Sequence, residues 1–233
     1  MMRIRRLIAA LACLVLPLSA TAQSSPVVVE LFTSQGCSSC PAADAFLAEL
    51  AHREDVLTLA FHVDYWDRLG WPDTFGSPDN TNRQYAYART FHNRSVWTPQ
   101  FVVGGRDYSK GNFRSMVKEY VNKQSAKGSS VAIKAKISGK KLVIETRGTA
   151  NYREKYDIVI VHFTPSETVA IKRGENAGRT IKYHNIVRST YHGGTWNGRD
   201  DKKFTVPLRA DPPVAVLVQE ADTGPIMAAQ VIR

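Results

Sequence analysis

The fold is decided by the stretch Phe32-Thr33-Ser34-Gln35-Gly36-Cys37-Ser38-Ser39-Cys40-Pro41, in which two cysteines stand between a strand-like and a helix-like segment. The residues before it, 27–32, are apolar and mostly β-branched, which is typical of a buried strand. Residues 41–50 are rich in alanine and carry apolar side chains at helical spacing. Proline is tolerated in the first turn of a helix. We therefore expect a strand, a Cys-x-x-Cys turn and a helix in direct succession.

The spacing of Cys37 and Cys40 predicts their chemistry. Side chains three residues apart across the start of a helix lie one turn from each other, so the two sulfurs can form a disulfide. At the helix N-terminus, free amide groups and the positive end of the helix dipole would stabilise a Cys37 thiolate. Cys37 is thus the predicted attacking thiol, and Cys40, deeper in the helix, is the predicted resolving thiol. This hypothesis requires that water reach Cys37.

The N-terminal segment predicts export. Three arginines within the first six residues precede a short apolar run, and the small residues Ala20-Thr21-Ala22 follow it. This pattern is typical of a cleaved secretory signal. We expect residues 1–22 to be removed and the mature protein to be periplasmic or secreted. No later segment is long and apolar enough to span a membrane.

Charge and cysteine count narrow the function classes. The formal net charge of +10 is scattered, and no basic patch alternates with aromatic residues, so we expect no nucleic-acid partner. Loss of residues 1–22 would remove Cys13 and leave a single pair. One pair does not make a disulfide-stapled scaffold. The pair is therefore redox-active, metal-binding or a small local disulfide.

The rest of the chain divides into an α/β half and a β-rich half. Strand-like and helix-like patterns alternate at first, with strands expected at 56–63 and 101–103 and helices at 80–91 and 112–123. Residues 126–130 are small and polar, which places a boundary between domains at 26–125 and 130–233. Beyond it, short strands at 157–163, 168–172, 180–188 and further on favour a β-sandwich. The predicted fold class is α+β, with a β-sandwich-like domain after an α/β domain.

A second motif places a proline directly before an apolar strand, in Thr98-Pro99-Gln100-Phe101-Val102-Val103-Gly104-Gly105. Together with the dithiol at a strand–helix junction, it resembles the thioredoxin superfamily. More narrowly, ELFTSQGCSSCP, HVDYWDRLGW, TPQFVVGG and IKRGENAGR resemble a family of uncharacterised exported bacterial proteins, catalogued as a domain of unknown function with a thioredoxin-like fold. The resemblance spans nearly the whole chain after residue 22. It implies a thioredoxin-like fold for 26–125 and brings no established substrate.

The resemblance also implies roles for Thr98 and Pro99. In a thioredoxin-like fold, a cis proline at this position faces the dithiol, and the residue before it binds the backbone of an incoming peptide as an added strand. The chain departs from thioredoxin in a long aromatic insertion at 65–77 and in the two serines between the cysteines. The serines supply neither a cation nor a proline beside the sulfurs. We therefore expect a moderately reducing pair rather than a strong oxidant.

Two interpretations of Glu30 are open. If its side chain is buried below the dithiol, it can shuttle a proton to Cys40 as a catalytic carboxylate. Otherwise it lies at the solvated end of the strand, which is the more common place for a carboxylate.

His62 and Asp64 follow a strand whose end should lie at the same edge as the dithiol. Cys37, Cys40 and His62, with Asp64 as a candidate fourth ligand, therefore form an alternative copper or zinc site. The other interpretation is a hydrogen-bonded histidine and an aspartate that caps a turn.

Two further segments have open interpretations. The aromatic residues of the insertion and the helix after it either form a local core or line a peptide groove beside the thiols; they are Trp66, Trp71, Phe75, Tyr85 and Tyr87. Trp66 is the predicted substrate contact among them. The glycine-containing segment 174–179 is expected to be a plain turn rather than a phosphate cradle.

The leading hypothesis is thiol–disulfide exchange with protein thiols or disulfides of the cell envelope, without a cofactor. One alternative is copper or zinc binding by the same cysteines. The other is a non-catalytic scaffold with a structural disulfide.

Overall fold

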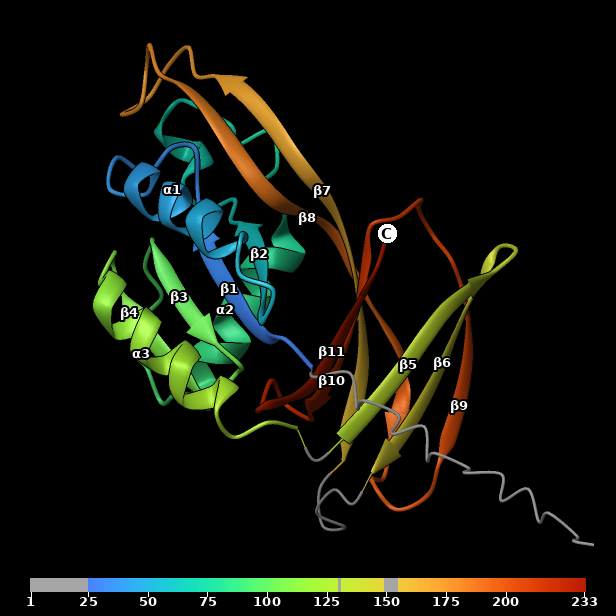
Figure 1. Ribbon diagram of the computed structural model, residues 1–233. Coiled ribbons are helices and arrows are strands. Elements are labelled where there is room, and N and C mark those ends of the chain that lie inside the picture. Colours follow the sequence, from blue (N-terminus) through green and yellow to red (C-terminus); the bar gives the residue numbers. More distant parts are fainter. Residues whose placement is uncertain (1–24, 130, 149–154) are drawn as a thin grey trace, which may run out of the picture.

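The computed structural model describes residues 25–129, 131–148 and 155–233 (Figure 1). The predicted signal at 1–22 lies outside these residues. The first half alternates strands and helices in the predicted order. Its elements are β1 (Val27–Thr33), α1 (Pro41–Leu50), β2 (Val56–His62), the 3-10 turn η1 (Asp67–Leu69), α2 (Pro78–Thr90), β3 (Gln100–Val103), β4 (Asp107–Lys110) and α3 (Arg114–Ser125).

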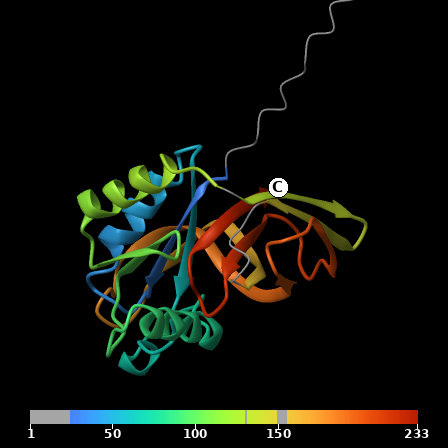
Figure 2. The same cartoon turned by 90° about the horizontal axis from the view of Figure 1, so that it is seen from below.

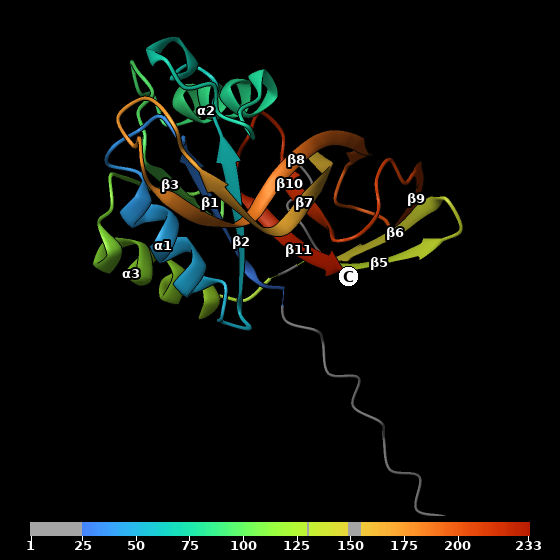
Figure 3. The same ribbon diagram turned by 90° about the horizontal axis from the view of Figure 1, so that it is seen from above.

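Strand β1 is the centre of this half. It pairs in parallel with β2 and antiparallel with β3, and β3 pairs antiparallel with β4. Val29 and Leu31 pack in the core that includes α1 and α3, whereas Val28 and Phe32 pack in the core that includes Tyr87 of α2. Figure 3 shows the helices on the two faces of the sheet. Because β1 is covered on both faces, its sequence is a continuous apolar run rather than an alternation.

The second half consists of strands. They are β5 (Val131–Ser138), β6 (Lys141–Gly148), β7 (Tyr156–Ala170), β8 (Thr180–Trp196), β9 (Lys202–Pro207), β10 (Val214–Glu220) and β11 (Ile226–Ile232). Strands β5, β6 and β9 form a three-stranded sheet that packs its apolar side chains against those of β7, β10 and β11. Figure 2 shows most of this half to one side of the helices, with the β7–β8 hairpin reaching back to them, and no described residue after α3 is helical.

The two halves share one sheet, which the sequence did not predict. Its eight strands run in the order β11-β10-β7-β8-β2-β1-β3-β4, so β8 of the second half lies beside β2 of the first. The predicted boundary at 126–130 falls where α3 leads into β5. The α+β class is confirmed as a mixed eight-stranded sheet with helices. The strands expected at 157–163 and 168–172 are one long strand, β7.

A buried ion pair within the first half is hydrogen-bonded to Gln219 of the second half. Arg83 Nε donates a hydrogen bond to Glu30 Oε1 over 2.7 Å, and Arg83 Nη2 donates to Gln219 Oε1 over 3.0 Å. The Tyr87 hydroxyl donates to Glu30 Oε2. Burial raises the pKa of Tyr87 well above its usual value, so the phenol keeps its proton. Since Glu30 and Gln219 come from different halves, this cluster couples their stability.

None of the helices among the described residues has the length and apolar character that a membrane span needs.

Replacement of Arg83 by alanine should lower the free energy of unfolding by about 3 kcal/mol, because it leaves the Glu30 carboxylate buried without its cation. Urea unfolding followed by circular dichroism measures this loss. Arg89→Ala, an exposed position on the same helix, is the matched control and should change stability little. Equal effects of the two substitutions would contradict the coupling role of the ion pair.

Candidate active site

Cys37 and Cys40 form a disulfide in the turn between β1 and α1. Cys40 is the N-cap of α1 and Pro41 is its first residue, so the proline occupies the position expected for it. Cys37 lies before the helix, in turns closed by hydrogen bonds from its own N–H to Ser34 O and from Cys40 N–H to Cys37 O. The prediction that Cys40 lies deeper in the helix is therefore wrong by about one turn.

The prediction that water reaches Cys37 is also wrong for this conformation. Cys37 is 1% exposed and Cys40 is fully buried, whereas Ser38 and Ser39 between them are exposed. The two sulfurs therefore lie beneath their own turn. Any exchange at this bond requires a movement that uncovers it.

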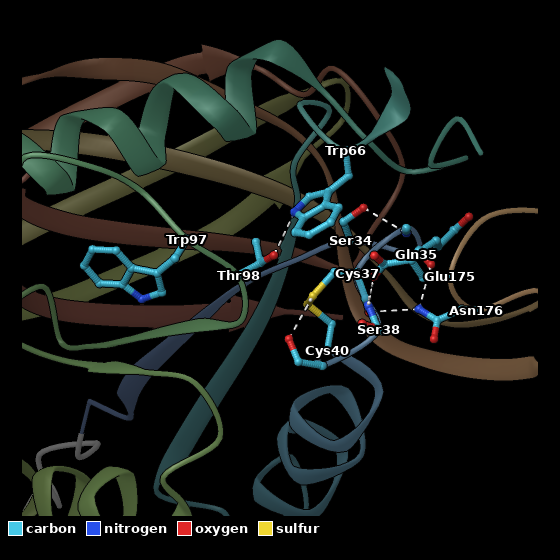
Figure 4. Close-up of a disulfide and its surroundings, with 12 residues drawn as sticks. Ser34, Gln35, Cys37, Ser38, Cys40, Trp66, Trp97, Thr98, Glu175 and Asn176 are labelled. Atoms are coloured by element: carbon cyan, nitrogen blue, oxygen red, sulfur yellow. Dashed lines mark hydrogen bonds between the residues drawn. A yellow bond between two sulfur atoms is a disulfide. The ribbon is translucent and has the colours of Figure 1, made fainter. Parts of the chain in front are cut away.

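The residues predicted to bind substrate gather beside the disulfide. The Trp66 Nε1–H donates a hydrogen bond to Thr98 Oγ1 over 2.8 Å, and the Thr98–Pro99 peptide bond is cis, as the resemblance implied. Figure 4 shows Trp66 and Thr98 next to the sulfurs. A Cβ at Gly36 would come within 3.2 Å of Trp66 Cβ, so glycine lets the indole approach the dithiol turn closely.

The segment predicted to be a plain turn, 174–179, contacts the dithiol turn directly. Asn176 Nδ2 donates to Gln35 O over 2.9 Å and to Cys37 O over 2.8 Å. The Ser38 N–H donates to Glu175 Oε2 over 3.1 Å. The glycines in this segment predict a turn. The local sequence does not predict which part of the chain the turn contacts.

Glu30 is buried, in agreement with one of its two interpretations. Its carboxylate is engaged by Arg83 and Tyr87 on the α2 side of the sheet. Helix α1, with Cys40 at its start, covers the opposite side. This placement gives no support to the proton shuttle predicted for Glu30.

A different buried carboxyl, that of Asp44, belongs to the helix that carries Cys40. The Asp44 N–H donates to Cys40 O, one helical turn earlier. Neither carboxyl oxygen of Asp44 has a hydrogen-bond partner of good geometry among the described residues, although the Thr33 hydroxyl lies near enough to oppose the rise of its pKa. Burial raises its pKa to about 7, although the charge of His62 opposes this shift. Sequence analysis missed Asp44, yet its spacing from Cys40 and Leu47 places it on the inward stripe of α1.

His62 is a buried histidine that is hydrogen-bonded on one side of its ring. Its Nδ1 lies 2.8 Å from Asp73 Oδ2, and the rings of Phe75 and Tyr183 pack edge-on against it. Asp73 also accepts a hydrogen bond from the Gln35 N–H over 2.7 Å, which ties the pair to the dithiol turn. Burial acts to raise the pKa of Asp73. The charge of His62 and these hydrogen-bond donors outweigh it and hold that pKa below its usual value.

The predicted copper or zinc site is not formed. Among the described residues, no group of three histidine, cysteine or acidic side chains is placed to hold a metal ion. Asp64, the predicted fourth ligand, accepts a hydrogen bond from the Thr81 hydroxyl over 2.6 Å. Its backbone N–H also donates to Thr81 Oγ1 over 3.2 Å, so Asp64 is tied to α2 rather than capping a turn.

The aromatic residues divide between the two interpretations. Phe75 and Tyr87 are buried and form core, as expected for a long insertion. Trp66 and Trp71 are half-buried at the dithiol turn, where Trp71 Nε1–H donates to Gln35 Oε1 over 2.9 Å. Tyr85 is exposed and stands apart from both groups.

The fold and the site define a mixed α+β protein with a buried disulfide at the start of its first helix. The chain belongs to the family described as protein of unknown function (DUF1223), which it matches over residues 28–219. The predicted membership of an uncharacterised family is thereby confirmed.

Two solved structures share this architecture. The crystal structure of protein AGR_C_4864 from Agrobacterium tumefaciens is 34% identical, with a TM-score of 0.77 over 91% of this chain and 96% of that one. HBP35 of Porphyromonas gingivalis is 14% identical, with a TM-score of 0.60 over 90% of this chain and 75% of that one, and shares the fold alone. No curated protein matches the chain.

Asp44 should make stability depend on pH. Its pKa in the folded protein lies above the ordinary value of 3.8, so the folded state keeps a proton that the unfolded chain has lost. Stability should therefore fall as pH rises from the ordinary value towards about 7, and should level off above it. In Asp44→Asn this fall should shrink by about 4 kcal/mol.

Urea unfolding at a series of pH values measures the effect of Asp44. Asp211→Asn, an exposed carboxylate, is the control and should keep the wild-type slope. The buried position of Asp44 would be refuted by parallel pH profiles of wild type and Asp44→Asn.

Proposed function

We propose that this protein is an exported thiol–disulfide oxidoreductase with a thioredoxin-like N-terminal half and a sandwich-like second half. The strand order β2-β1-β3-β4 with helices on both faces supports the thioredoxin-like part. So do the positions of the disulfide between β1 and α1 and of Pro99 directly before β3. The packing of the three-stranded sheet on β7, β10 and β11 supports the sandwich-like part. Export is proposed from the N-terminal sequence, and the expected location is the periplasm or the exterior.

One observation carries the proposed activity: the disulfide lies beside main-chain groups that have no partner. Among the described residues, the backbone N–H and C=O of Thr98 form no hydrogen bond, and only its side chain is engaged, by Trp66 and Tyr65. Free main-chain groups next to a reactive bond can pair with an extended peptide as an added strand. Thr98 would thus present a partner's cysteine to the disulfide.

The exchange would proceed in two steps. With the pair reduced, the Cys37 thiolate attacks a partner disulfide, a mixed disulfide forms, and the partner's other sulfur leaves as a thiolate. Cys40 then attacks the Cys37 sulfur, restores the Cys37–Cys40 bond and releases the second partner thiolate. The partner disulfide is reduced and the pair is oxidised. The reverse sequence would oxidise a partner dithiol.

Asp44 is the carboxyl we assign to proton transfer in place of Glu30. Cys40 must lose a proton before it attacks, and a carboxyl with a pKa near neutrality is suited to accept one. Glu30, held by Arg83 and Tyr87, is committed to its ion pair.

The burial of both sulfurs favours a second candidate, a scaffold with a structural disulfide. Cys37 and Cys40 are almost inaccessible in this conformation, as structural pairs commonly are. This candidate predicts that reducing agents break the bond only after the protein unfolds.

Trapping tests the exchange function. Cys40→Ser removes the resolving thiol, so mixed disulfides through Cys37 should accumulate with envelope proteins and appear as adducts on non-reducing gels. Cys37→Ser is the matched control and should trap far fewer adducts, because its remaining thiol is the inner one. Failure of Cys40→Ser to form adducts, together with a Cys37 that resists alkylation in the folded variant, would favour the scaffold.

A further inference from the structure

The three-stranded sheet of β5, β6 and β9 has two unlike faces. Apolar side chains on one face pack against β7, β10 and β11. The alternate residues place their side chains on the other, outer face, where they are exposed or half-buried. Figures 1 and 3 show this sheet at the end of the molecule away from α1 and α3. The outer face is therefore free to meet another surface.

The outer face and the β5–β6 turn are basic. They carry six exposed cations, which are Lys134, Lys136, Lys140, Lys141, Arg147 and Lys203. Glu145 is the one acidic residue of the three strands, and its Oε1 lies 3.7 Å from Lys203 Nζ. Arg147 Nε lies 2.9 Å from Oδ2 of Asp201, in the loop before β9. The other four lysines form no ion pair with a described residue, so the face keeps a net positive charge.

The register of the strands spreads this charge over a continuous area. Lys134 lies opposite Glu145, and Glu145 lies opposite Lys203, so a single carboxylate stands between two lysines. Two residues further along β5, Lys136 lies opposite Val143, with no carboxylate beside it. Part of the positive charge that is scattered along the sequence thus gathers on one side of one sheet.

The residue types on the outer face favour a lipid surface over a protein partner. Five of its six cations are lysines, and the three strands place no aromatic side chain on this face. Interfaces between proteins are enriched in aromatic residues and arginine and depleted in lysine. Lysine clusters instead suit the diffuse negative charge of an anionic bilayer, where each cation near the surface strengthens binding about fivefold.

Protection of strand edges explains only part of this pattern. Lysines on edge strands such as β5 and β9 hinder pairing with another chain. Lys141 and Arg147, however, belong to β6, the central strand of the sheet, which has no free edge.

We propose that the outer face of β5, β6 and β9 docks the protein on an anionic phospholipid bilayer. The attachment is peripheral and electrostatic, because none of the large apolar side chains that are exposed among the described residues lies on this face. The dithiol turn leads into α1, at the other end of the molecule, so docking leaves that turn uncovered by the bilayer (Figure 1). The inference goes beyond the exchange function and does not depend on it.

Sedimentation with lipid vesicles tests the docking. The chain from residue 23 onwards is used, because the apolar segment of the predicted signal would bind lipid by itself. It should bind vesicles of equal parts phosphatidylglycerol and phosphatidylcholine at low ionic strength, but not vesicles of phosphatidylcholine alone. Added salt should release it, because salt screens the attraction. The triple variant Lys134→Gln/Lys136→Gln/Lys141→Gln should lower the partition coefficient about a hundredfold, at about fivefold for each lysine.

Lys123→Gln/Lys172→Gln/Lys182→Gln is the matched control, because it removes the same charge from exposed positions outside this sheet, and it should bind nearly as the wild type does. Circular dichroism should show both triple variants folded, since exposed substitutions change stability little. Vesicle binding involves no thiol exchange, so its failure leaves the exchange function untouched.

Two results would overturn the docking surface. One is equal partition of the two triple variants, or no binding of the wild type to the anionic vesicles. The other is binding of soluble polyglutamate through the same lysines without binding to vesicles, which would favour an acidic protein partner instead.

Discussion

Strand β8 joins the sheet beside β2, with Ala60 opposite Ile186. The surroundings of the disulfide depend on this pairing. It is supported by a hydrogen bond from Asn185 Nδ2 to Thr58 Oγ1 over 2.9 Å and by the packing of Tyr183 and Ile186 on Phe75. Because the strand is fixed there, its hairpin delivers Asn176 to the dithiol turn. The second half of the chain therefore contributes contacts to the dithiol turn, through Glu175 and Asn176.

The two faces of the first half use buried charge differently. On the α2 side, the Glu30 carboxylate accepts hydrogen bonds from Arg83 and Tyr87. Because its charge is paired, this cluster stabilises the fold and the contact between the two halves. On the α1 side, the Asp44 carboxyl is buried without a hydrogen-bond partner of good geometry among the described residues, near the charge of His62. An unpartnered carboxyl costs stability, and its raised pKa suits it to proton transfer. This contrast supports a structural role for Glu30 and the proposed proton transfer by Asp44.

Local pattern predicted the elements of the first half and the strand–disulfide–helix junction. It missed β4, because Asp107–Lys110 is a short polar edge strand without an apolar alternation. It also missed the pairing of β8 with β2 and the contacts of the β7–β8 loop with the dithiol turn. The bond from Ser38 to Glu175 joins residues 137 positions apart, and no periodicity or turn signal encodes such a contact. Thr98, Pro99 and Trp66 were found because their motif is local, whereas Asp44 and Asn176 needed the tertiary structure.

The central claim is that the Cys37–Cys40 bond can be made and broken while the chain remains folded. Equilibration of the full chain with glutathione buffers of graded potential, followed by alkylation and by circular dichroism on the same samples, tests it most directly. The account predicts a reversible two-electron transition in the moderately reducing range with the fold retained throughout. A disulfide that stays oxidised until the dichroism signal of the folded protein is lost would contradict it.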